Sequence, residues 1–243
     1  RALEAYDFAL VVDPSNVSAI HNMANTYATI EKYAEASDLF MSLLDFEPEN
    51  PRVYSSIGEC FEKLGNNDKA IEYFDMALGI SSSLSDAYYG KTLVYLKTQK
   101  VNLALESIKK SIALEPENYD YWLGLAKVKF EMGKDDEAIE AYREATLLNA
   151  DEPDAYIGLA EIRLFQERFD IVEEIYHEVG EKFNDVPALK IIYAAALYLI
   201  GKPKLALNML KQAKKHNPFT IEDFLAIVSV VNDDDFLLKL KQL

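Results

Sequence analysis

The sequence predicts an all-α fold in which antiparallel helix pairs are stacked into an array. Three observations predict it. Apolar residues recur with helical spacing, glycine and proline separate the apolar segments, and the whole pattern repeats every 34 residues. One helix pair of this size cannot bury its apolar face alone, so each pair must pack on its neighbours.

The clearest repeat is Pro51–Leu84. Its first predicted helix places four core residues at spacings that bring them to one face: Tyr54, Ile57, Gly58 and Phe61. Its second predicted helix does the same with Ala70, Phe74 and Ala77. Gly65 lies between the two helices and suits a left-handed helix terminus because glycine has no Cβ to clash there.

The rest of the chain follows this register without insertion or deletion. We expect one solenoid domain over residues 1–243, with a half repeat at 1–16, full repeats over 17–220 and capping helices over 221–243. The six full repeats are Val17–Asn50, Pro51–Leu84, Ser85–Asn118, Tyr119–Glu152, Pro153–Val186 and Pro187–Thr220. Seven of the eight prolines fall on two phases of the period, and Pro51, Pro153 and Pro187 are predicted at the first helical position.

The pattern changes after Thr220. Four residues continue the first-helix register and predict a further helix: Phe224, Ile227, Val228 and Val231. The segment 232–235 then predicts the cap of a shorter helix that ends at Leu243, because no spaced oxygen ligands for calcium follow it.

This combination of core residues, turn glycine and terminal proline resembles the tetratricopeptide repeat. The resemblance covers the chain from Arg1 to about Thr220 and implies a right-handed superhelix with a concave inner groove. Some positions depart from the family pattern, which predicts altered local packing in the same fold. They are Lys91, Thr92, Lys129, Arg163 and Lys190.

Charge and composition narrow the function. The chain carries 25 Lys and Arg against 41 Asp and Glu, a formal net charge of −16, which repels nucleic acids and anionic membranes. The longest apolar run, near Ile191–Ile200, is too short to span a membrane, so we expect no membrane insertion. The single cysteine, Cys60, excludes an internal disulfide and agrees with a default cytoplasmic localisation.

Residue patterns that would carry chemistry are missing from the sequence. It has no phosphate-binding glycine loop, paired cysteines or nucleophile elbow, and its three histidines occupy different slots of distant repeats. Cys60 lies beside core positions, which predicts a buried small hydrophobe. We therefore expect no enzyme activity, no cofactor and no metal site.

In the family, the first-helix face that holds the slots of Ser55, Glu59 and Glu62 lines the concave groove. The resemblance predicts a groove that is polar at its N-terminal end and apolar from Tyr89 onward. The residues assigned to this peptide-binding groove are Tyr89, Leu93, Leu96, Leu123, Lys127, Phe130, Ile157, Glu161, Leu164, Phe165, Ile191 and Tyr198.

Two further patterns recur at the groove. Aspartates at its edge either favour a basic or neutral apolar ligand or stabilise helix N-termini, and we favour the helix role: Asp86, Asp120 and Asp154. Glycines inside the first helices either allow tight contact between adjacent first helices or leave room for a ligand backbone, and we favour tight contact: Gly90, Gly124 and Gly158.

The sequence therefore predicts a protein–protein interaction scaffold that binds an apolar or basic peptide or helix of a partner protein in its groove. The alternative is a structural module that forms a homo-oligomer through the groove or through exposed ends. The half repeat at the start and the apolar residues near the C-terminus, such as Phe224 and Phe236, favour that alternative.

Overall fold

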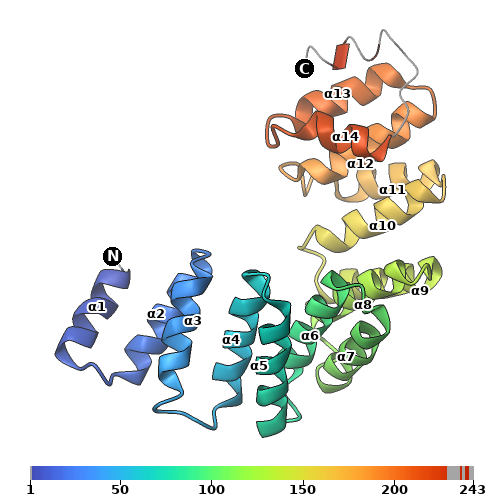
Figure 1. Cartoon of the computed structure of the whole chain (residues 1–243). Helices are drawn as coiled ribbons and strands as arrows, with labels where there is room; N and C mark the ends of the chain where they lie inside the picture. Colours follow the sequence, from blue (N-terminus) through green and yellow to red (C-terminus); the bar gives the residue numbers. More distant parts are fainter. Residues whose placement is uncertain (1, 229–235, 237–238, 241–243) are drawn as a thin grey trace. The chain divides into compact units, whose positions relative to one another are not determined.

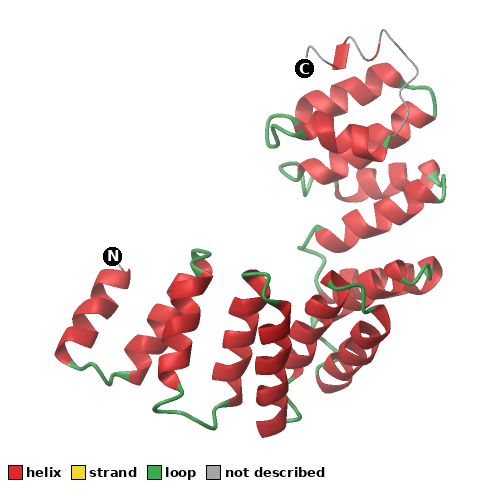
Figure 2. Ribbon diagram, viewed as in Figure 1, coloured by secondary structure: helices red, strands yellow, loops and turns green. Residues whose placement is uncertain are grey.

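The computed structural model describes residues 2–228, 236, 239 and 240, and this part of the chain is built from helices alone (Figures 1 and 2). The predicted all-α class is confirmed. The chain divides into two compact units, unit 1 (residues 1–134) and unit 2 (residues 135–243). The boundary falls between the two helices of the predicted repeat Tyr119–Glu152, and the single domain stays a prediction.

Unit 1 holds the helices that Figure 1 draws from blue to green. They are α1 (Ala2–Val12), α2 (Val17–Thr29), α3 (Tyr33–Leu43), α4 (Pro51–Lys63), α5 (Asn67–Ile80), α6 (Ser85–Lys97), α7 (Val101–Leu114) and α8 (Tyr119–Glu131). Unit 2 continues with α9 (Asp135–Leu148), α10 (Asp154–Phe165), α11 (Phe169–Val179), α12 (Pro187–Leu199), α13 (Pro203–Ala213) and α14 (Thr220–Ile227). Sequential helices pack on one another within each unit, as in α4 against α5 and α12 against α13.

Helix starts follow the predicted 34-residue register closely. Asn50 and Asn66 accept backbone N–H bonds at the starts of α4 and α5, which satisfies donors that the first helical turn leaves free. Pro51 and Pro187 occupy the first helical turn as predicted. Pro153 does not: it is the N-cap of α10, and the helix begins at Asp154.

The turn between the two helices of a repeat has a left-handed residue at one fixed slot. Gly65, Gly133 and Gly201 have φ values of 76°, 68° and 77°, so the predicted role of glycine there is confirmed. The intervening repeats place other residues at the same slot: Glu31 at φ 61°, Gln99 at 58° and Glu167 at 57°. A side chain in this conformation costs roughly 1–2 kcal/mol, so these three turns are strained.

The recurrent glycines of the first helices make room for rings. A Cβ on Gly90 would collide with the ring of Phe74, and one on Gly158 would collide with Tyr142, each from the preceding second helix. The expected contact between adjacent first helices is present only in part, at Gly124, where a Cβ would lie 3.0 Å from the ring of Tyr89. The glycines therefore serve packing, but chiefly against second helices.

Lys190, one of the departures from the family pattern, takes over a hydrogen bond that aromatic residues make in other repeats. Tyr54 Oη donates to the carbonyl of Pro48 at 3.0 Å, and Trp122 Nε1 donates to that of Pro116 at 2.7 Å. Lys190 occupies the same slot, is buried, and donates from Nζ to the backbone carbonyl of Asn184 and to its Oδ1. The ammonium thus replaces the aromatic donor, although burial lowers the pKa of Lys190.

The other departures also find partners. Lys91 Nζ lies 2.6 Å from Asp75 Oδ1, the Thr92 hydroxyl donates to the carbonyl of Tyr88, and Arg163 Nη1 donates to Gln166 Oε1. The predicted polar substitutions therefore change local bonding without interrupting the helices.

The predicted C-terminal first helix is confirmed as α14, with Phe224 and Val228 buried. Phe236 and Leu240 are buried in the same cluster, and the rings of Tyr198 and Phe236 lie 4.6 Å apart. Val231, the capping segment 232–235 and the remainder of the predicted last helix lie outside the described residues, apart from positions 236, 239 and 240.

Candidate functional site

In unit 1 the predicted groove residues differ in accessibility. Lys127 is exposed, whereas Leu123 is buried in the interior. The others are half-buried: Tyr89, Leu93, Leu96 and Phe130.

In unit 2 the predicted residues also divide. Phe165 is 67% exposed and Glu161 is exposed, whereas Leu164 and Ile191 are buried. Ile157 and Tyr198 are half-buried against the core of the unit, and Tyr198 packs on Phe224 and Phe236 of the C-terminal cluster.

Unit 1 contains a recess of about 290 Å³, which we call the acidic recess. Its lining combines the fully buried residues Phe74 and Tyr121 with the exposed acids Glu59, Asp86 and Asp120. The lining residues are Glu59, Glu62, Lys63, Phe74, Asp86, Tyr89, Gly90, Leu93, Asn118, Asp120 and Tyr121. The predicted groove residues Tyr89 and Leu93 thus meet in one site with acids from α4, α6 and α8.

Hydrogen bonds and ion pairs fix two of these acids. Glu62 is buried and pairs with Lys63 at 3.4 Å and with Lys97. Tyr121 Oη donates to Asp86 Oδ1 at 2.7 Å, and burial raises the pKa of Tyr121. The crowding of protein atoms around Glu59, followed by the charge of Asp86, raises the pKa of Glu59 to about 7.

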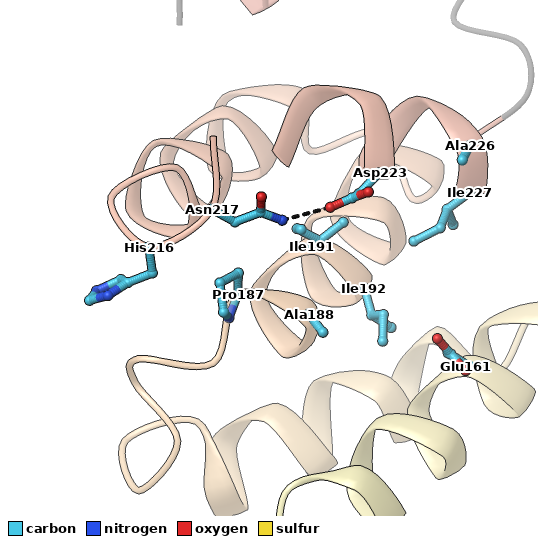
Figure 3. Close-up of a pocket in the computed structure, with 10 residues that line it drawn as sticks. All are labelled: Glu161, Pro187, Ala188, Ile191, Ile192, His216, Asn217, Asp223, Ala226 and Ile227. Carbon is cyan, nitrogen blue, oxygen red and sulfur yellow. Dashed lines mark hydrogen bonds between the residues drawn. The ribbon is translucent and has the colours of Figure 1, made fainter. Parts of the chain in front are cut away.

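Unit 2 contains a second recess of about 550 Å³, which we call the apolar recess. Figure 3 shows Ile191 and Ile192 on α12 and Ile227 on α14, with Glu161 from α10 on another side. The lining residues are Glu161, Pro187, Ala188, Ile191, Ile192, His216, Asn217, Asp223, Ala226 and Ile227. Of the predicted groove residues, Glu161 and Ile191 belong to it.

A polar pair closes one edge of the apolar recess. Asn217 Nδ2 donates to Asp223 Oδ2 at 2.6 Å (Figure 3). Asn217 Oδ1 also accepts from the backbone N–H of Phe219 at 2.8 Å. These bonds hold the loop before α14 against the first turn of that helix. The recess therefore has a fixed polar edge beside isoleucine side chains.

Sequence reasoning missed the contributions of second helices and loops to both recesses. Phe74 reaches the acidic recess from α5, and His216 and Asn217 reach the apolar recess from the loop between α13 and α14. The sequence predicts α14 to be the first helix of a further repeat. That prediction could have added Ala226 and Ile227 to the groove, which is assigned only as far as the preceding first helix.

Nothing in the described residues provides a group of three or more His, Cys, Asp or Glu side chains placed to hold a metal ion. Cys60 is buried, and burial raises the pKa of its thiol to about 12, which agrees with the predicted packing role. Among the same residues, every helix falls short of the length and apolar content that a membrane span requires.

Stacked helix pairs with left-handed turns at a constant period define a helical-repeat scaffold. Two models described as tetratricopeptide repeat match residues 21–85 and 95–162, together more than half of the chain. The chain belongs to the tetratricopeptide repeat family.

Solved structures with this fold support the assignment. The match to a chain of the APC/C hetero-tetramer Cut9–Hcn1 covers 98% of this chain and 45% of that chain, with a TM-score of 0.76 and 17% sequence identity. A tetratricopeptide repeat protein from Parabacteroides merdae matches 94% of this chain and 91% of its own, with a TM-score of 0.71 and 17% identity. The match to YrrB, described as a TPR protein with an unusual peptide-binding site, covers 84% of this chain and 98% of that chain, with a TM-score of 0.58 and 20% sequence identity. At these identities the likeness shows the fold alone.

Curated relatives match over shorter stretches. The human cell division cycle protein 16 homolog is 36% identical over 61 residues, which is 25% of this chain and 10% of that protein. BBSome complex member BBS4 of Bos taurus is 25% identical over 118 residues, 49% of this chain and 22% of the relative. The human protein O-mannosyl-transferase TMTC3 is 25% identical over 113 residues, 46% of this chain and 12% of the relative. The chain thus spans a small part of these relatives.

Proposed function

We propose that this chain is a protein–protein interaction scaffold that binds a peptide or helix of a partner protein along the groove face of its first helices. Proteins of this family generally mediate protein–protein interaction. The observation that carries the proposal is that each unit has a recess lined by groove residues, one at Tyr89 and Leu93 and one at Glu161 and Ile191.

Catalysis plays no part in this proposal. The recesses combine carboxylates with apolar side chains, and they contain no nucleophile paired with a base among the lining residues. Binding of a segment by shape, apolar contact and charge is what such surfaces provide.

Two groove-blocking variants test the proposal. Leu93→Arg adds a long charged side chain in the acidic recess, and Ala226→Arg adds one at an exposed position in the apolar recess. Ala113→Arg on α7 is the matched control, because Ala113 is exposed and lines neither recess. Circular dichroism checks that all three variants remain helical.

The measurement is affinity capture with quantitative mass spectrometry, followed by direct binding of each captured protein in purified form. We expect partners that bind wild type and Ala113→Arg with equal affinity but lose binding to at least one groove variant. Equal binding of every captured protein to all four chains would show that the groove is not the binding surface.

A second candidate, self-assembly through α1, has its own observation. Phe8, Val11 and Val12 are 71%, 80% and 70% exposed, which makes one stretch of this helix apolar and accessible. Light scattering over a concentration series tests it with Phe8→Ser and Val11→Ser combined. A dimer that the double variant dissociates supports self-assembly, and a monomer at every concentration excludes it.

A further inference from the structure

The acidic recess carries more information about its ligand than the apolar recess does, because its lining has both a charge and a shape. Its lining includes the exposed acids Glu59, Asp86 and Asp120, which come from three different helices. A ligand in this recess therefore meets carboxylates as well as aromatic rings.

The acids that line the recess differ in whether a lysine pairs with them. Glu62 pairs with two lysines, Lys63 and Lys97, so its charge is neutralised. Within the described part of the chain no ion pair is formed by Glu59, Asp86 or Asp120. The recess thus keeps an excess of negative charge in the folded protein.

Helix ends account for only part of this excess. Asp86 and Asp120 lie in the first turns of α6 and α8, where the helix dipole favours a carboxylate. Glu59 lies within α4, beyond its first turn, and has no such support. The crowding around Glu59 and the nearby Asp86 raise its pKa to about 7, which agrees with an uncompensated pair of acids. Glu59 is therefore the carboxylate that a ligand would have to stabilise.

A buried hydroxyl beside Glu59 is also without a partner. Ser55 is 4% exposed, and its Oγ forms no hydrogen bond in the described structure. It precedes Glu59 by one helical turn and lowers the pKa of the Glu59 carboxyl, against the larger effects of burial and of Asp86. Glu59 lines the recess and Ser55 does not, so Glu59 is the acceptor in this pair that a ligand N–H can reach.

The walls select the shape of the group that enters. The rings of Tyr89 and Tyr121 lie 5.2 Å apart at an angle of 42°, and Leu93 adds an aliphatic side chain. Tyr121 is fully buried and Tyr89 is half-buried, so the Tyr89 ring is the aromatic face available to a cation, and a guanidinium stacks on it better than an ammonium does. A recess of about 290 Å³ is at the small end of ligand pockets and suits one side chain, not a helix.

We infer that the acidic recess binds an arginine side chain of the partner segment that occupies the groove, with its guanidinium at Glu59 and Asp86 and its methylene stem against Leu93. This inference rests on the proposed function, because the arginine is presented by a bound segment. It adds a requirement that the proposed function lacks: the segment must be basic at one position.

The probe is a peptide selected from a random phage-displayed library panned against the intact chain. We expect the selected peptides to share an arginine next to apolar residues and to lose binding to Leu93→Arg. A synthetic copy with citrulline in place of that arginine keeps the size and removes the charge. We expect it to bind about tenfold more weakly, a loss typical of a charge-assisted hydrogen bond.

The protein side of the test is the pair Glu59→Gln with Asp86→Asn, which keeps side-chain shape and leaves Tyr121 an acceptor. The matched control is Asp38→Asn with Glu106→Gln, which removes the same charge from exposed positions on α3 and α7. We expect about tenfold weaker arginine-peptide binding for the recess pair and less than about twofold for the control pair. The citrulline peptide should bind wild type and the recess pair alike.

Two results would overturn the inference and leave the proposed function intact. In the first, the selected peptides lose binding to Leu93→Arg but contain no basic residue. In the second, the recess pair and the control pair weaken peptide binding equally. Failure to select any peptide that is lost from Leu93→Arg or Ala226→Arg would contradict the proposed function itself.

Discussion

The acidic recess of unit 1 and the apolar recess of unit 2 are built from the same kind of helix pair but differ in chemistry. The lining of the first combines tyrosine and phenylalanine with three exposed acids, and that of the second combines isoleucines with a polar pair, Asn217 and Asp223. The repeat fixes where a recess forms, because it fixes which helix faces meet. A few variable positions then decide what the recess can bind.

The largest expected effect concerns the floor of the apolar recess. Ile191 is 3% exposed, so Ile191→Asp places a charge in the core of unit 2 and should cost about 3–5 kcal/mol of unfolding free energy. Leu205→Asp is the control, because Leu205 is 52% exposed near the start of α13. Urea unfolding followed by circular dichroism measures both. Equal stability of the two variants would mean that the recess floor is not part of the core.

Ring packing against glycine should be similar in the two units. Gly90→Ala collides with Phe74 in unit 1 and Gly158→Ala with Tyr142 in unit 2, and each should cost about 1–3 kcal/mol. Gly79→Ala should do the opposite and stabilise α5 by up to about 1 kcal/mol, because a Cβ there meets no atom within 4 Å. Thermal unfolding compares the three, and a gain in melting temperature for Gly90→Ala would contradict the packing.

The stability of the protein should depend on pH through Glu59, a residue of the acidic recess. Its pKa is raised from 4.5 to about 7, so between these values the folded state binds more protons than the unfolded state. Stability therefore falls as pH rises through this window. Glu59→Gln removes that loss and should be more stable than wild type at pH 8 by about 1 kcal/mol, after allowance for solvent at this exposed carboxylate.

The charged neighbours of Glu59 in this recess are Glu62, Lys63, Asp86 and Asp120. They remain in the variant, so only the titration of Glu59 differs between the two proteins. Urea midpoints at pH 4 and pH 8 give the result. A stability difference that is the same at both pH values would mean that Glu59 titrates normally.

The smallest expected effect lies in the strained turns, one from each unit. Gln99→Gly and Glu167→Gly should each stabilise the protein by about 0.5–1 kcal/mol, because glycine adopts positive φ freely but loses more entropy on folding. Gln99→Ala keeps the Cβ and should bring no gain. Differential scanning calorimetry can resolve shifts of this size, and equal shifts for alanine and glycine would rule out relief of backbone strain.

The sequence predicts the helices well because their signals are local. Apolar spacing, N-cap asparagines and turn glycines act within a few residues, so the register places the start of α4 at Pro51 and that of α5 at Asn67. The same signals do not reveal that Glu31, Gln99 and Glu167 share the glycine conformation. There the surrounding helix pair imposes a backbone that the residue type alone does not favour.

The candidate site is predicted less well because it depends on neighbours far apart in the sequence. One groove slot holds Leu123 and Ile191 in buried positions and Ile157 in a half-buried one, so the slot alone does not fix accessibility. The approach of Glu59 to Asp86 depends on how α4 packs beside α6, and Phe74 controls that packing through Gly58 and Gly90. Spacing along one helix contains none of this information.

Trp122, whose indole N–H donates to the loop carbonyl of Pro116, is an intrinsic fluorophore of the folded chain. Trp122 is the single tryptophan of the chain, and it lies on α8 of unit 1, directly after Tyr121 in the sequence. Its emission therefore reports the unfolding of unit 1 alone, while circular dichroism reports both units.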